Sequence, residues 1–174
     1  MTNKLDKIDI EITEGKKFKA CDRLRNLINE QPNNLNLYDK LASVYFESGF
    51  YDAAGKYWIL IEPKNDNIKK CIEIYKKSVN YSGTKILQDL KFSGIKSELD
   101  EYAKNQLEEL EKDSFKRSKY VPNFGKEKNK YEIPYKHNLK LKYKIIEKIG
   151  ILILISIPVL IILGILKVYE WIAN

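Results

Sequence analysis

The side chains that most often act as nucleophiles, general bases or metal ligands are scarce in this chain. Its 174 residues include two cysteines and one histidine. Cys21 and Cys71 stand 50 positions apart, so the sequence holds no CxxC redox or metal-binding pair. His137 has no second histidine with which to share a metal ion, and it lies in a basic stretch. We therefore expect two reduced cysteines in the core, no metal site and no histidine-assisted hydrolysis.

Glycine-rich phosphate-binding loops are absent from the sequence as well. No GxxxxGK[ST] motif occurs, and no GxGxxG follows a strand-like run. Gly49 and Gly55 are better interpreted as a helix-ending and a helix-packing glycine. A carboxylate pair works as acid and base only when its two groups have different environments, and Glu108 and Glu111 both fall on a predicted exposed helix. The sequence predicts no enzyme activity and no cofactor.

Apolar residues recur at helical spacing through the first two thirds of the chain. The predicted helices cover 17–29, 37–48, 51–62, about 68–79, and a short stretch around 87–92. Gly49 is placed to end the second of these helices in a left-handed conformation, and Asn65 and Asp66 are capping candidates for the fourth. A further apolar stripe from Ile95 to Leu110 predicts about 20 residues of helix before Pro122, with an acidic face that suits a capping helix.

The chain also resembles itself at a shift of 34 residues, the mark of a repeat architecture. Gly15 aligns with Gly49 and then with Gly83, and Ala20 aligns with Ala54. One set of residues in the second unit resembles the tetratricopeptide (TPR) pattern of two antiparallel helices packed through small residues: Tyr38, Leu41, Ala42, Tyr45, Gly49, Tyr51, Ala54 and Trp58. The fold class expected from this resemblance is all-α, with about two and a half TPR-like helical hairpins and a capping helix.

A second resemblance concerns longer stretches of the sequence. Residues 20–27, 35–45, 54–60 and 90–94, with Pro32 between the first two, resemble a functionally uncharacterised bacterial family whose N-terminal domain is a degenerate TPR-like helical repeat. The resemblance covers roughly half of the chain. It implies a bacterial context and supplies no activity.

The TPR resemblance implies a place where a partner would bind. Such arrays bind proteins on the concave face formed by the first helix of each hairpin. The matching positions here are Asn36, Asp39, Ser43, Phe46 and Glu47 in one unit, and Lys70, Glu73 and Lys77 in the next. The alternative for this set is an ordinary solvated helix surface, and Tyr57 and Trp58 are better interpreted as core. We expect a protein partner of unknown identity and no nucleic acid.

Charge and hydropathy change after residue 114. Residues 1–114 carry a net charge of −1, whereas 115–148 hold 11 basic and 3 acidic residues, a net charge of +8. Eighteen uncharged and mostly apolar residues, 149–166, follow. As a helix with a rise of about 1.5 Å per residue, such a run would approach the ~30 Å hydrocarbon core of a bilayer. The expected divisions are a repeat domain at 1–114, a basic linker at 115–145, a transmembrane tail-anchor helix at 146–168 and a short external tail at 169–174.

These divisions predict a single-pass protein of the cytoplasmic membrane, with its N-terminal domain in the cytoplasm because lysines concentrate before the span. The lysines expected to contact lipid headgroups, anionic ones above all, are Lys136, Lys140, Lys142, Lys144 and Lys148. The expected function is a membrane-tethered scaffold or adaptor for protein–protein interaction. The alternative is an immunity-type or inhibitory membrane factor that acts through its transmembrane helix.

Overall fold

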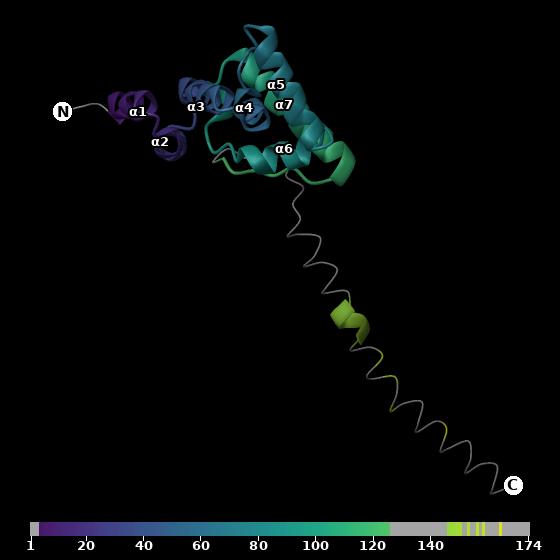
Figure 1. Ribbon diagram of the computed structural model, residues 1–174. Helices are drawn as coiled ribbons and strands as arrows, with labels where there is room; N and C mark the ends of the chain where they lie inside the picture. Colours follow the sequence, from purple (N-terminus) through teal and green to yellow (C-terminus); the bar gives the residue numbers. More distant parts are fainter. Residues whose placement is uncertain are drawn as a thin grey trace, which may run out of the picture. The chain divides into compact units, whose positions relative to one another are not determined.

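The computed structural model describes residues 4–125 and 146–150, together with the single positions 153, 156, 158 and 164. The chain divides into two units, Met1–Tyr131 and Glu132–Asn174, and each is considered by itself. The described part of the first unit is all helical and contains no strand, as Figure 1 shows. Its helices are α1 (Lys4–Thr13), α2 (Lys17–Glu30), α3 (Leu35–Glu47), α4 (Tyr51–Trp58), α5 (Asp66–Ser78), α6 (Gly83–Leu90), the short 3-10 helix η1 (Lys96–Glu98) and α7 (Glu101–Ser118). The predicted all-α class is confirmed.

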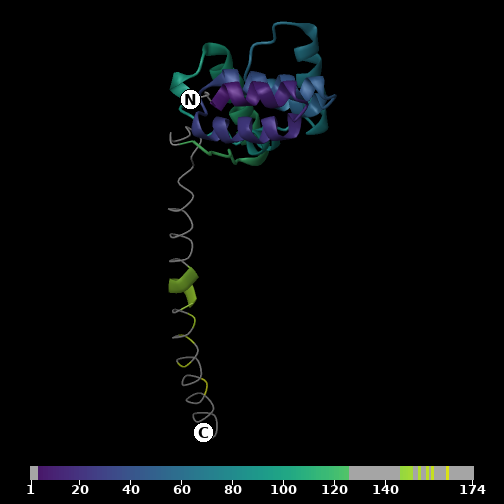
Figure 2. The ribbon, with the colours of Figure 1, turned by 60° about the vertical axis from the view of Figure 1, so that its left-hand side comes forward.

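Neighbouring helices in the sequence pack against one another through most of the first unit. Close pairs are α1 with α2, α2 with α3, α3 with α4, α4 with α5, and α6 with α7, and α4 also touches α6. Figure 2 shows α1 and α2 running side by side. The part of the chain that corresponds to the third repeat of the 34-residue pattern departs from the predicted hairpin. Here α6 pairs with α7 rather than with α5.

The glycines of the 34-residue repeat explain this departure. Gly15 (φ +75°) and Gly49 (φ +81°) end α1 and α3 in the left-handed conformation that a glycine adopts without strain. Gly83 instead begins α6, where an added Cβ would lie 2.4 Å from the carbonyl oxygen of Leu110 on α7. Gly83 therefore permits close packing of α6 on α7, whereas Gly15 and Gly49 end helices.

The core is formed by apolar stripes on all seven described α-helices of the first unit, and its fully buried residues lie between Ile8 and Leu110. Ala42 on α3 and Ala54 on α4 are both fully buried. Cys21 and Cys71 are buried and not disulfide-bonded, in agreement with the prediction that they are core thiols. Burial raises the pKa of both thiols, which makes them poor nucleophiles.

Several helix boundaries differ from the predictions, and α6 begins at Gly83, before the predicted stretch around 87–92. Helix α4 ends at Trp58 instead of continuing to residue 62. The fully buried Ile59 and Leu60 follow it in a turn. Helix α7 begins at Glu101, after Asp100, whose side chain accepts a hydrogen bond of 2.8 Å from the backbone N–H of Ala103.

A pair of hydrogen bonds links the loop between α2 and α3 to the loop between α6 and α7. The side-chain amide of Asn33 donates to the carbonyl oxygen of Ile95 at 2.7 Å, and its oxygen accepts from the N–H of Ile95 at 2.9 Å. The neighbouring Gly94 is buried, and an added Cβ there would lie 2.5 Å from the same Asn33 oxygen. We call this pair of bonds the Asn33 clasp.

The predicted membrane location is wrong on the evidence of the described residues. No helix among them is long and apolar enough to cross a membrane. The longest, α7, has 18 residues and carries charges along its length. Most residues of the predicted span at 146–168 lie outside the described residues, and the described ones do not form such a helix.

The division into two units leads to a first prediction. A chain that ends at Tyr131 should keep the far-ultraviolet circular dichroism of a folded helical protein and melt cooperatively, because all of its buried core lies at or before Leu110. Circular dichroism during thermal melting, compared with the full-length chain, checks this. A broad, non-cooperative transition would show that the first unit depends on residues after Tyr131.

Candidate functional site

The first group of predicted partner-binding residues, those between Asn36 and Glu47, lies along one side of α3. Asn36 and Glu47 are exposed, and Ser43 is half-buried between them. Their spacing of seven and four residues places them on one stripe of the helix. Asp39 and Phe46, at the edge of this stripe, have a second role because both contact α4.

The contacts of Asp39 and Phe46 with α4 are specific. The indole N–H of Trp58 donates a 2.7 Å hydrogen bond to the Asp39 carboxylate. The ring of Phe46 lies 5.7 Å from that of Trp58 and 5.5 Å from that of Tyr51, centroid to centroid. Asp39 and Phe46 therefore hold α3 on α4, and the exposed part of the predicted face is smaller than the sequence indicates. Trp58 is buried, as predicted.

The residues in the second group of predicted partner-binding residues are all exposed on α5. Lys70, Glu73 and Lys77 project from one side of this helix, and Ile74, 43% exposed, lies among them. Glu73 accepts a hydrogen bond from the hydroxyl of Tyr81 and lies 3.8 Å from the ammonium of Lys77. We define the α3/α5 surface as the outward side chains Asn36, Ser43, Glu47, Lys70, Glu73, Ile74 and Lys77.

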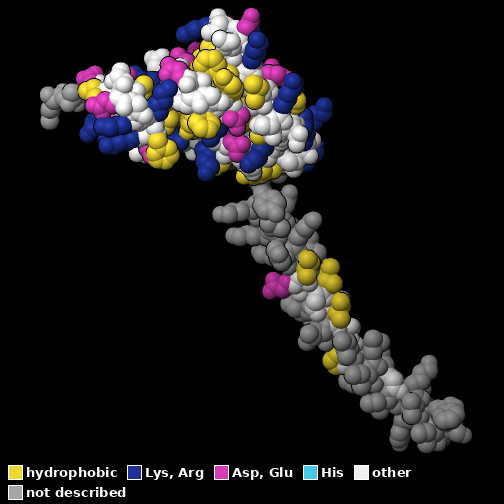
Figure 3. Space-filling view, viewed as in Figure 1, with side chains coloured by type: hydrophobic (Ala, Val, Ile, Leu, Met, Phe, Trp, Pro, Cys, Tyr) yellow, Lys and Arg dark blue, Asp and Glu magenta, His cyan; other side chains and the backbone are white. Residues whose placement is uncertain are grey.

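Exposed aromatic side chains lie in the chain after each helix of this surface. Among them, Phe50 and Tyr81 were not indicated by the sequence, and Tyr51 was predicted only as part of the TPR pattern. Phe50 (59% exposed) lies in the turn between α3 and α4, Tyr51 (48%) is the first residue of α4, and Tyr81 (45%) lies in the turn between α5 and α6. Figure 3 shows hydrophobic side chains among basic and acidic ones on the face in view. The sequence feature that could have indicated their exposure is their position at or after a helix end with left-handed backbone, where few buried residues are within reach of a side chain.

Ion pairs tie α3 to the first hairpin. Lys17 on α2 lies 3.4 Å from Glu47, and Lys40 on α3 pairs with Asp9 on α1. All four side chains are at least partly exposed, so each pair contributes little to stability. Their effect on the α3/α5 surface is to leave Glu47 partly neutralised.

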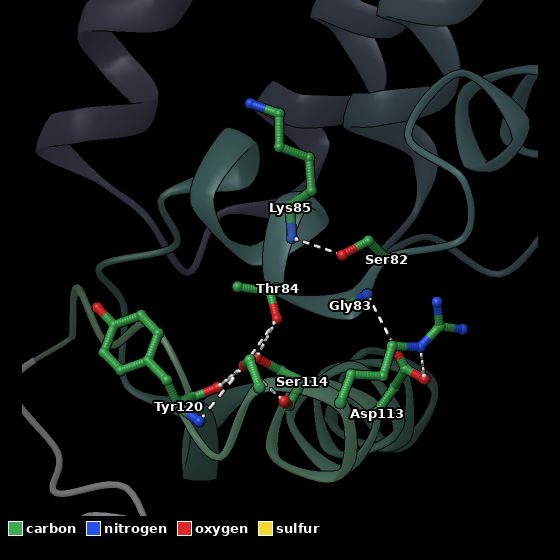
Figure 4. Close-up of polar contacts among 9 residues, drawn as sticks. Ser82, Gly83, Thr84, Lys85, Asp113, Ser114 and Tyr120 are labelled. Carbon is green, nitrogen blue, oxygen red and sulfur yellow. Dashed lines mark hydrogen bonds and ion pairs between the residues drawn. The ribbon is translucent and has the colours of Figure 1, made fainter.

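A polar junction joins the start of α6 to the end of α7 (Figure 4). The Asp113 carboxylate accepts from the N–H of Gly83 at 2.9 Å, and the hydroxyls of Thr84 and Ser114 lie 2.8 Å apart. Ser114 is fully buried and donates to the carbonyl oxygen of Tyr120 at 2.6 Å. These contacts hold the start of α6 on the end of α7.

A partly open cavity of about 340 Å³ lies beside this junction. Leu87, Phe92, Leu107 and Phe124 give it an apolar lining, and the charged Lys96 and Glu111, which pair at 2.9 Å, stand at its margin. Its size is near the lower limit of small-molecule pockets. Among the described residues, no group of three or more histidine, cysteine, aspartate or glutamate side chains is placed to hold a metal ion.

A cluster of tyrosines and cations lies on the side of α3 opposite to Asn36, and the sequence analysis missed it. The rings of Tyr45 on α3 and Tyr57 on α4 stack 5.8 Å apart with an interplanar angle of 6°. Arg25 on α2 donates a hydrogen bond to the hydroxyl of Tyr45. The ammonium of Lys56 lies 4.9 Å from the centre of the Tyr57 ring, within cation–π distance.

Burial shifts the acid–base properties of this cluster. It raises the pKa of Tyr45 and of Tyr57, and the charge of Arg25 opposes the rise in both. Burial lowers the pKa of Lys56, and the charges of Arg25, Lys91 and Lys85 lower it further. We call Arg25, Tyr45, Lys56 and Tyr57 the tyrosine–cation cluster.

The basic residues predicted to lie at a membrane surface are almost all outside the described part of the chain. Lys136, Lys140, Lys142 and Lys144 belong to the stretch that the structure does not describe. Lys148 is exposed within the helical residues 146–150.

Comparison with known proteins gives one match. A family model described as "Family of unknown function (DUF6584)" matches residues 1–170. No curated protein and no solved structure matches the chain.

Proposed function

The chain belongs to DUF6584, a family of unknown function, and from this premise we propose that its first unit is a TPR-like module that binds another protein through the α3/α5 surface. The carrying observation is that α3 and α5 each turn a row of side chains away from the core. These are the positions that the sequence resemblance to TPR arrays assigns to partner binding.

The composition of the α3/α5 surface supports this proposal. Lys70, Glu73 and Lys77 offer both signs of charge on α5, which favours orientation of a partner more than raw affinity. Ile74 supplies exposed apolar area among them. Tyr51, the first residue of α4 and in contact with Phe46, is partly exposed and of the residue type enriched among those that dominate binding energy.

The strong packing of α5 on α4 supports it as well. Gly55 on α4 brings the backbones of these helices together, a close pairing of the kind that a TPR-like module requires. The Asn65 side chain caps the start of α5 by accepting from the N–H of Ile68 at 3.0 Å. The lysines of α5 are therefore carried by a rigid element.

Charge reversal on α5 tests the proposal. We expect the double substitution Lys70→Glu and Lys77→Glu to weaken binding of the partner by about tenfold or more, because two attractive contacts become repulsive. The partner is first identified by affinity capture from extract of the source cells and then purified. Isothermal titration calorimetry with the full-length chain measures its dissociation constant.

The matched control is Lys112→Glu with Lys116→Glu, an equal change of charge on exposed lysines of α7. Both double variants should melt at the temperature of the parent chain, because Lys77 loses only a solvent-exposed pair with Glu73. Equal loss of affinity in both variants would mean that net charge alone attracts the partner, and full affinity in the α5 variant would place the binding surface elsewhere.

A further inference from the structure

Lys56 is a half-buried cation for which the described residues provide no ion-pair partner. The carboxylate that acts on it most strongly, Asp89 on α6, is engaged with other groups. Asp89 lies 2.9 Å from the ammonium of Lys85 and accepts from the hydroxyl of Tyr75 at 3.4 Å. A cation held partly out of water without a counter-charge is costly, and an anion would offset that cost.

The charged groups that act on Lys56, and the groups that contact these or Lys56 itself, come from several elements. Arg25 and Asp22 lie on α2, Tyr45 on α3 and Tyr57 on α4, next to Lys56 itself. Lys85 and Asp89 lie on α6, and Lys91 directly follows that helix. Lys56, Arg25, Lys85 and Lys91 thus interact electrostatically with only two carboxylates, Asp22 and Asp89, an excess of two positive charges.

Both carboxylates are already committed within the cluster. Asp22 pairs with Arg25, and Asp89 pairs with Lys85. The guanidinium of Arg25 also bonds the Tyr45 hydroxyl, which orients that hydroxyl so that its own proton points elsewhere. The cluster therefore offers an ammonium, a fixed guanidinium and a phenol O–H as donors, and lacks a spare acceptor.

We propose that the tyrosine–cation cluster binds the phosphate group of a phosphomonoester. A phosphomonoester carries between about −1.5 and −2 charges near neutral pH and three acceptor oxygens, which matches the excess charge and the donors of the cluster. The Tyr45–Tyr57 stack provides an apolar wall for the organic part of the ester. Since Tyr45 is nine residues after Asn36, half a turn of α3 separates this site from the α3/α5 surface, and the site does not depend on the proposed function.

Titration of the full-length chain tests this site. The probes are inorganic phosphate and phenyl phosphate, with succinate as a dianion of carboxylates, all at one ionic strength set with sodium chloride. We expect both phosphates to bind, phenyl phosphate more tightly because of its ring, and succinate to bind more weakly. We expect Lys56→Met to weaken phosphate binding by about tenfold, as the loss of a charge-assisted hydrogen bond does, and Lys56→Arg to retain it.

The controls separate a site from general attraction and from misfolding. Lys112→Met removes an exposed lysine of α7 and should leave phosphate affinity unchanged. Lys56→Met should melt no lower than the parent chain, because it removes a half-buried charge without a partner. Chemical shifts of the Tyr45 and Tyr57 rings, followed by NMR in the unmodified chain, report binding even where a variant fails to fold. No binding at millimolar phosphate, equal affinity of the parent and Lys56→Met, or equal affinity for succinate would each overturn the proposal.

Discussion

Gly55→Ala is expected to destabilise the first unit by about 3 kcal/mol or more, at the upper end of overpacking effects. A Cβ at this position would lie 2.0 Å from the carbonyl oxygen of Cys71 and 2.9 Å from the backbone nitrogen of Ile72. Both atoms belong to the backbone of α5, so no side chain can rotate to make room. Helix propensity alone would favour alanine by about 0.5–1 kcal/mol, which makes the predicted sign informative.

Chemical denaturation of the parent chain and of Gly55→Ala measures this loss. Asn26→Ala, on the exposed side of α2, is the matched control and should be neutral or slightly stabilising. An unchanged denaturation midpoint in Gly55→Ala would show that α4 and α5 are further apart than the structure has them. The predicted reading of Gly55 as a helix-packing glycine is confirmed by these contacts.

Arg23→Met is expected to cost about 2–3 kcal/mol, because it leaves the buried carboxylate of Glu11 without its main partner. The side chain of Glu11 is 6% exposed, and both of its oxygens accept from the Nε of Arg23 at 2.9 Å. Lys19 remains 3.6 Å from Glu11 and reduces the loss below that of a fully isolated charge. The weakened contact lies between α1 and α2, so hydrogen exchange should rise first in α1.

The double variant Glu11→Leu with Arg23→Met distinguishes loss of the ion pair from loss of packing. Removing both charges should recover most of the stability, since an apolar pair can replace a buried ion pair at little cost. Urea denaturation of the two single variants and the double variant closes the thermodynamic cycle. If the double variant is as unstable as Arg23→Met, the aliphatic stem of Arg23 matters and its charge does not.

Local signals in the sequence determine much of the helical part of the fold. Helix α2 follows its apolar stripe to Glu30, next to Pro32, and α5 begins after Asn65 because that side chain caps it. Gly49 ends α3 as its position predicted. These features depend on residues a few positions apart, so the sequence pattern is enough to find them.

Features that depend on distant residues could not be found in this way. The pairing of α6 with α7 depends on Gly83 meeting Leu110, and the tyrosine–cation cluster brings Arg25 and Lys56 together from two helices. In the sequence these residues look like exposed charges and an ordinary repeat glycine. The predicted partner-binding residues were misjudged for the same reason. The contact of Asp39 with Trp58 depends on the packing of α3 on α4, which the sequence pattern does not specify.

The Asn33 clasp has a consequence for how the length of this array can change. Open repeat stacks hold only neighbour-to-neighbour contacts, so they grow or shrink by whole units and unravel from their ends. Here Asn33 and Ile95, 62 positions apart, are joined by two hydrogen bonds that bridge from the first hairpin to the segment before α7. Insertion of another hairpin between them would break the clasp, so this architecture is closed to growth.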